Sequence, residues 1–150
     1  MFWKAKAPPT LEGMELAELC RLEAEALYRS GQYHCAEAVF ETIRRHFSPE
    51  TSQTMLASVS GFGGGSGSGC ICGAVSAGTV ALGLVLHDKK RTTHLTRDLH
   101  SWFRQKYGAT CCKSIRTGQA KDFCPVLTGE VGGRIAEMLV SAGIPGSSGN

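Results

Sequence analysis

The sequence predicts a single all-α domain, a bundle of five or six helices in which a glycine-rich loop leads into a buried central helix. Apolar residues recur at helical spacing through most of the chain, and no alternating strand pattern or Asn-Gly hairpin interrupts them. The 150 residues are also the size of one ordinary domain with its own core. We expect residues 1–150 to form this domain, with poorly ordered tails at 1–10 and 142–150.

The first two helices are expected at residues 11–30 and 33–47. The first carries apolar residues among Glu and Arg side chains, at Met14, Ala17, Leu22 and Ala26, and Gly31 follows as a stop. The second repeats an apolar residue every four positions, at Cys35, Val39, Ile43 and Phe47. This spacing places Cys35 on the buried stripe of its helix.

A short third helix is predicted from Ser48-Pro49-Glu50 to about residue 60, because proline is favoured at the first position of a helix. Residues 51–86 carry no Asp, Glu, Lys, Arg or His. Within them residues 72–86 are apolar, but this stretch is shorter than the ~20 residues that a membrane span needs. We therefore predict a buried core helix and no membrane span.

Two further helices are expected towards the C-terminus, at 92–107 and 128–141. The apolar side of the first consists of Leu95, Leu99, Trp102, Phe103 and Tyr107, and Gly108 ends it. The apolar side of the last consists of Val131, Ile135, Met138 and Leu139.

The charges are mild in total but unevenly distributed. A net charge of +3 is too small for the dense basic stripe that nucleic-acid binding requires. Residues 11–50 carry eight acids and four bases, whereas residues 87–121 carry nine bases against two acids. Two interpretations stay open: solvated helix faces, or complementary patches that orient a partner or a second copy of the chain.

The loop Gly61–Gly69 is rich in glycine and leads directly into the apolar segment. It contains neither G-x-G-x-x-G nor a Gly-Lys-Ser/Thr motif, and no strand precedes it, so a nucleotide site is not predicted. A flexible tether is the alternative given by composition. We favour a backbone cradle around Cys70 and Cys72, because glycine lets N–H groups approach an anionic group closely.

Seven cysteines stand at positions 20, 35, 70, 72, 111, 112 and 124. They form no Cys-x-x-Cys, no haem-attachment motif and no paired zinc spacing, so any site must be assembled by the fold. The count is odd and the start of the chain has no secretory pattern, so we expect a cytoplasmic protein with reduced or metal-bound thiols. A thiol at a helix N-terminus is stabilised in its thiolate form. Cys20 is not expected to serve such a site, and we expect it to be a small buried apolar residue.

Several segments together resemble a known family. They read Cys35-Ala-Glu-Ala-Val39, Gly61-Phe-Gly-Gly-Gly65, Cys72-Gly-Ala74, Ala81-Leu-Gly-Leu84 and Phe103-Arg-Gln-Lys-Tyr-Gly108, followed by Cys112 and Cys124. From about Gly31 to Leu139 the chain resembles the C_GCAxxG_C_C family of putative redox-active proteins. It is also similar to the non-haem module of split-Soret cytochromes.

The resemblance implies four functional cysteines, Cys35, Cys72, Cys112 and Cys124, that hold an iron–sulfur cluster in a module that forms a homodimer. Cys112 is preferred to Cys111 because family members place this cysteine four residues after the glycine that matches Gly108. We expect backbone around Gly63, Gly64, Gly65 and Gly73 to lie against the cofactor. Two departures, Ala77 in place of the family's glycine and the extra Cys70, leave open whether Cys70 replaces one of the four.

Three functions therefore remain open. The first is an iron–sulfur protein for electron transfer or redox sensing, which would serve a redox partner protein. The second is a metal-free thiol–disulfide protein, and the third is a structural or partner-binding bundle whose cysteines fill the core. No catalytic residue is predicted, because the histidines form no metal-binding pair and no serine has a nucleophile-elbow context.

Overall fold

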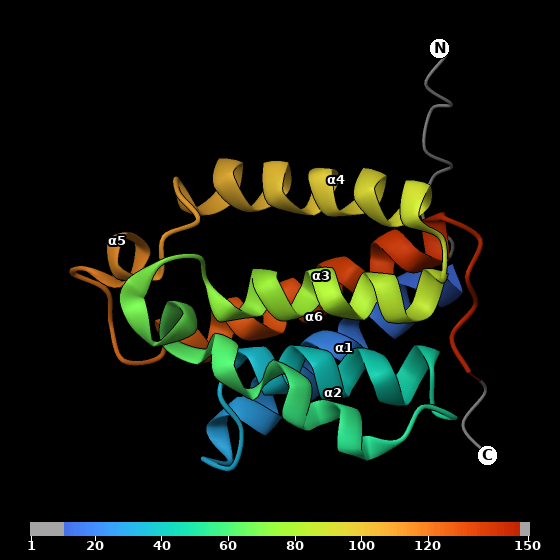
Figure 1. The fold of residues 1–150 in the computed structure, drawn as a ribbon, viewed down its shortest axis with the longest axis horizontal. Coiled ribbons are helices and arrows are strands. Elements are labelled where there is room, and N and C mark those ends of the chain that lie inside the picture. Colours follow the sequence, from blue (N-terminus) through green and yellow to red (C-terminus); the bar gives the residue numbers. More distant parts are fainter. Residues whose placement is uncertain (1–10, 148–150) are drawn as a thin grey trace.

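The computed structural model describes residues 11–147, and the elements within this range are helical, with no strand (Figure 1). The α-helices are α1 (Leu11–Arg29), α2 (Cys35–Phe47), α3 (Gly73–Leu86), α4 (Lys89–Tyr107), α5 (Cys112–Arg116) and α6 (Phe123–Ser141). The all-α fold class is therefore confirmed. The expected tail at 1–10 lies outside the described residues. So do residues 148–150, the last three of the tail expected at 142–150.

Helix α3 lies at the centre of the bundle and contacts α2, α4 and α6 (Figure 1). None of its residues is exposed, and Val75 and Leu82 are fully buried. Its apolar sequence therefore makes it the buried central helix that was predicted. Among the described residues, no helix has both the length and the apolar character needed to cross a membrane.

Helix α1 packs against α6 through small residues rather than through its large apolar ones. A Cβ on Gly132 would stand 2.9 Å from the Cβ of Ala24, and one on Gly129 would stand 2.8 Å from the carbonyl oxygen of Arg21. The predicted apolar face of α1 is therefore wrong for three of its four residues, since Met14 and Leu22 are 54% and 50% exposed and Ala26 is exposed as well. The close approach of the two backbones leaves no room for large side chains between them.

Three helix boundaries differ from the sequence prediction. The third helix is a 3-10 helix, η1 (Gln53–Phe62), which begins after Pro49 because Ser52 caps it by accepting a hydrogen bond from the Thr54 N–H. Helix α4 begins at Lys89, capped by the Asp88 carboxylate. Helix α6 begins at Phe123, and Pro125 lies in its first turn, where no backbone donor is required.

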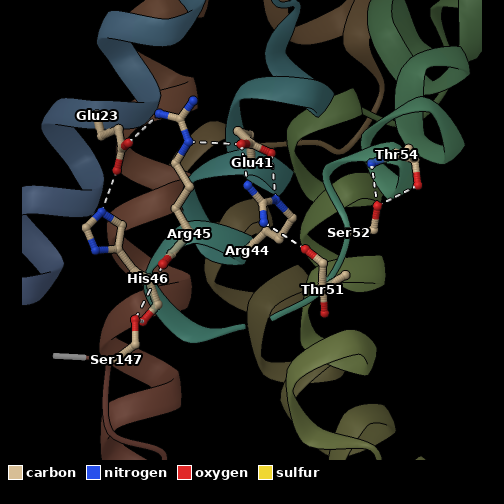
Figure 2. Close-up of polar contacts among 9 residues, drawn as sticks. All are labelled: Glu23, Glu41, Arg44, Arg45, His46, Thr51, Ser52, Thr54 and Ser147. Atoms are coloured by element: carbon tan, nitrogen blue, oxygen red, sulfur yellow. Dashed lines mark hydrogen bonds and ion pairs between the residues drawn. The ribbon is translucent and has the colours of Figure 1, made fainter. Parts of the chain in front are cut away.

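A partly buried ion-pair network joins α1 to α2 (Figure 2). The Glu41 side chain has no exposed surface and accepts hydrogen bonds from both Arg44 and Arg45. Arg45 also donates a hydrogen bond to one carboxylate oxygen of Glu23 at 2.8 Å. The Nε2 atom of His46 contacts the other carboxylate oxygen of Glu23 at 2.5 Å. Burial opposes ionisation of Glu41, but the two guanidinium groups outweigh it and hold its pKa below the ordinary value.

The described part of the expected C-terminal tail, residues 142–147, follows α6 and returns to α2. The Ile144 N–H donates to the Leu139 carbonyl at 2.9 Å. The N–H of Ser147 donates to the His46 carbonyl at 2.7 Å, and the Ser147 hydroxyl bonds the same oxygen (Figure 2). This segment therefore lies against the end of α2 opposite to Cys35.

Candidate redox site

A cavity of about 420 Å³ lies at the end of the bundle that α5 covers, and Cys35, Cys72, Cys112 and Cys124 all line it. The other three cysteines do not: Cys20 is buried between helices, Cys70 is exposed, and Cys111 is half-buried outside the lining. The structure thus brings together the four cysteines that the resemblance selects. Burial raises the pKa of Cys20 to about 12, consistent with a cysteine that serves as core packing.

Each cavity cysteine stands at the beginning of a helix. Cys35 is the first residue of α2, Cys72 is the N-cap of α3, Cys112 is the first residue of α5 and Cys124 is the second residue of α6. Three of these helices, α2, α3 and α6, are long enough to carry a substantial dipole, with its positive end at the cavity. The arrangement therefore favours negative charge on the sulfur atoms.

Cys35 and Cys72 are in direct contact. The Cys72 thiol donates a hydrogen bond to the Cys35 sulfur, and this bond lowers the pKa of Cys35 and raises that of Cys72. Desolvation opposes the charge on Cys35, but backbone N–H groups of Gly64, Ala36 and Ala74 add further bonds to its sulfur. Cys35 is therefore the preferred thiolate of the pair.

The glycines expected beside the cofactor have two different roles. Gly63 and Gly64 line the cavity directly. A Cβ on Gly65 would stand 2.8 Å from the Cys112 Cβ, and one on Gly73 would stand 2.8 Å from the Cys35 Sγ. These last two residues therefore let cysteines approach where any side chain would collide.

The loop before Cys70 winds in the left-handed direction. The φ angle lies between 64° and 68° at Gly64, Gly65 and Gly67. Ser66, which stands between Gly65 and Gly67, has a φ of 58°. This turn, η2 (Gly65–Gly69), closes with a 3.2 Å bond from the Cys70 N–H to the Gly65 carbonyl. The glycine run therefore folds into a turn rather than an extended tether, because glycine adopts this backbone conformation at little cost. Gly65 in this turn lies against Cys70 and Cys112 and not against Cys72.

Two cavity residues lie one helical turn after a cysteine and were missed by the sequence analysis. Arg116 follows Cys112 by four positions and hydrogen bonds its sulfur, which raises the pKa of the arginine. Thr128 follows Cys124 by four positions, is fully buried, and its hydroxyl has no hydrogen-bond partner. The i, i+4 spacing places both beside their cysteines and is the pattern that could have identified them.

Tyr28 reaches the same cavity from the C-terminal turn of α1. Its hydroxyl hydrogen bonds Cys124, and burial together with the neighbouring Cys124 raises the pKa of the phenol. Burial also raises the pKa of Cys124, although the Arg116 guanidinium opposes this. No sequence pattern connects Tyr28 with the cysteines, so only the fold identifies it.

The described residues, 11–147, contain no group of three or more His, Cys, Asp or Glu side chains placed to hold a metal ion. The four cysteines surround a cavity instead of converging on one point. The site can therefore stabilise anionic sulfur, and it presents two thiols in contact and two more that line the same cavity.

The comparison with protein families identifies the chain. A family model described as putative redox-active protein (C_GCAxxG_C_C) matches residues 33–138, which include all four cavity cysteines. No curated protein and no solved structure matches the chain. The matched segment runs from just before α2 into α6, so it covers the elements that build the cavity. The chain belongs to the C_GCAxxG_C_C family of putative redox-active proteins.

Proposed function

We propose that the protein is an electron-transfer or redox-sensing protein in which Cys35, Cys72, Cys112 and Cys124 hold an iron–sulfur cluster. The observation that carries the proposal is the cavity lined by these four cysteines and by none of the other three. Four cysteine thiolates are the usual ligand set of such clusters. A cluster contains more than one iron, so its ligands need not converge on a point as those of a single ion do.

Three further observations fit such a group. The unpartnered Thr128 hydroxyl is a buried donor at the cavity, and buried donors are nearly always satisfied. Gly65 and Gly73 remove the side chains that would displace Cys112 and Cys35. Helices α2, α3 and α6 direct their positive ends at the cavity, which favours an anionic occupant.

When bound, a cluster would supply one-electron transfer at a potential set by its surroundings. The backbone N–H groups of Gly64, Ala36 and Ala74 stabilise negative charge on Cys35. Arg116 places a positive charge beside Cys112 and Cys124. These groups favour the more negative, reduced state, so they raise the reduction potential.

The experiment is anaerobic purification and reconstitution, followed by an absorption spectrum and iron and acid-labile sulfide assays. A brown protein with stoichiometric iron and sulfide is expected. Cys72→Ser should lose the colour, whereas Cys70→Ser, at an exposed position outside the cavity, should keep it. A wild-type protein that stays colourless and metal-free after reconstitution would contradict the proposal.

The contact between Cys35 and Cys72 favours a second candidate, thiol–disulfide exchange without metal. The two thiols would lose two electrons and two protons to form a disulfide, while the disulfide of a partner protein is reduced to two thiols. Mass spectrometry of the metal-free protein after oxidation by glutathione disulfide tests this candidate. A Cys35–Cys72 cross-link supports it, and only mixed glutathione adducts on Cys70 or Cys111 would count against it.

A further inference from the structure

Three basic side chains surround the outer side of the four-cysteine cavity. Arg116 lines the cavity and two hollows beside it. Lys113 lines one of these hollows and Lys121 lines the other. All three residues are exposed. They therefore form one basic face, Lys113–Arg116–Lys121, around the two hollows that Cys112 and Cys124 also line.

No carboxylate of the described residues pairs with the bases of this face, although Arg116 also hydrogen bonds the Cys112 sulfur. Among the described residues, none of the three forms an ion pair with a carboxylate, and Asp122 is the one acid in the stretch 109–122. The arginines of α1 and α2 differ, because Glu side chains pair with them. Two other bases near this end are paired, Arg29 with Glu25 and Lys106 with Glu130, whereas no ion pair among the described residues includes Arg104 in the last turn of α4.

We propose that the Lys113–Arg116–Lys121 face is the docking surface for an acidic redox partner protein. This inference rests on the proposed function and names the class of its partner. Electron or thiol exchange requires the partner to reach the cysteines closely, and this face lies directly over two of them. Uncompensated surface charge steers an oppositely charged partner and fixes its orientation.

The spacing favours a protein surface over a small anion. The charges lie on exposed side chains distributed over two hollows, and they do not converge on one buried point. A small anion would contact Arg116 and one lysine at most, because the two lysines line different hollows. An acidic protein can contact all three, so its binding should depend on both lysines together.

Equilibrium binding of a fluorescent ten-residue polyglutamate peptide tests the surface. The Lys113→Glu/Lys121→Glu variant should bind the peptide about tenfold more weakly than wild type, since it reverses two of the three positive charges of the face. The matched control is Lys89→Glu/Lys90→Glu, which makes the same charge change at exposed residues where α4 begins, at the opposite end of the bundle. It should keep near wild-type affinity, and wild-type affinity should fall with added salt.

Equal losses in both variants would overturn the proposal, because binding would then follow net charge alone. Absence of wild-type binding, or wild-type affinity in Lys113→Glu/Lys121→Glu, would overturn it too. Thermal melts establish that both variants fold, and glutamate keeps the Cβ with which Lys113 lies against Gly69.

A second measurement separates the surface from the redox function. Ferricyanide, an anion, accepts one electron from the reduced site and becomes ferrocyanide. Its reaction rate should fall severalfold in Lys113→Glu/Lys121→Glu and stay unchanged in the control, whereas a cationic cobalt(III) complex should show no such fall. If ferricyanide takes no electrons from any variant, the proposed function fails, and the peptide binding still decides the docking surface.

Discussion

The Sγ of Cys35 lies 2.8 Å from the position that a Cβ on Gly73 would occupy. The same Cβ would stand 2.6 Å from the Phe62 carbonyl oxygen, so it would meet backbone on its other side. The residue after Cys72 must therefore be glycine if Cys35 is to contact Cys72. This relationship connects the glycine-rich part of the sequence to the geometry of the thiols.

Gly73→Ala should consequently destabilise the protein and separate Cys35 from Cys72. Overpacking of this kind costs about 1–3 kcal/mol, which urea unfolding measures. The matched control is Gly83→Ala in the same helix, where the new Cβ would lie 3.7 Å from a Thr92 methyl group, an ordinary contact. Alanine is favoured over glycine in helices by ~1 kcal/mol, so this control should be neutral or stabilising. Equal effects from both substitutions would refute the proposed collision.

Gly65→Ala and Gly67→Ala form a second matched pair in the loop. Both glycines have positive φ, 65° and 68°, so alanine is strained to a similar degree at each. A Cβ on Gly65 would stand 2.8 Å from the Cys112 Cβ and 2.7 Å from the Cys70 backbone nitrogen, whereas nothing lies within 4 Å of the Cβ position at Gly67. We expect Gly65→Ala to lower iron and sulfide retention in the reconstituted protein well beyond Gly67→Ala. Similar retention in the two variants would show that backbone strain at positive φ lowers iron and sulfide retention, and that a collision of the new Cβ with Cys112 and Cys70 does not.

Thr128→Val should remove a buried hydroxyl that has no hydrogen-bond partner among the described residues. Since such a group costs about 1–3 kcal/mol, the free energy of unfolding should rise by about 1 kcal/mol. Thr42 provides the control, because its hydroxyl is also buried without a partner but does not line the cavity. Both valine variants should stabilise the metal-free protein alike.

The two threonines should differ once the site is loaded. A hydroxyl that donates to a cluster stabilises its reduced form, so Thr128→Val should lower the reduction potential and Thr42→Val should not. Protein-film voltammetry measures both values. Equal shifts of the reduction potential in the two variants, or no shift in Thr128→Val, would show that the Thr128 hydroxyl does not donate a hydrogen bond to the cluster.

Stability should fall in acid because of Glu41. Its pKa is lowered in the folded state, so its contribution is fully present above the unfolded pKa near 4.5 and is lost as pH falls through the folded pKa. Glu41→Gln should cost about 1–3 kcal/mol at pH 7, since it removes the buried carboxylate that accepts hydrogen bonds from the partly buried Arg44 and the exposed Arg45, and it should flatten the acid limb. Chemical denaturation from pH 3 to 7 checks both effects. The exposed Glu15→Gln should change stability by less than about 0.5 kcal/mol, and a wild-type curve that is flat in acid would contradict the account.

The sequence predicted well those helices whose regularly spaced apolar residues pack into a part of the core that accommodates large side chains. Val39, Ile43 and Leu99 recur at helical spacing, and all three are buried. The prediction failed for α1, where hydropathy favoured Met14 and Leu22 although the glycines of α6 admit only small residues. Helix α5 was also missed, because five residues are too few to show a period.

The sequence identified the cysteines that line the candidate site, but it did not identify the other residues around them. The resemblance selected Cys35, Cys72, Cys112 and Cys124 although they are far apart in the sequence, and the fold assembles them around one cavity. Tyr28 comes from α1, and its place beside Cys124 depends on how α1 packs on α6. Such contacts arise from tertiary packing, which local spacing does not encode.

The most direct test of the central claim is electron paramagnetic resonance of the reduced, reconstituted protein and of its seven single Cys→Ser variants. We expect an iron–sulfur signal in wild type that Cys20→Ser, Cys70→Ser and Cys111→Ser retain. Loss or alteration of the signal is expected from serine at each of the four cavity positions, Cys35, Cys72, Cys112 and Cys124. A signal that survives all four of these substitutions, or no signal in wild type, would contradict the assignment of the cavity as a cluster site.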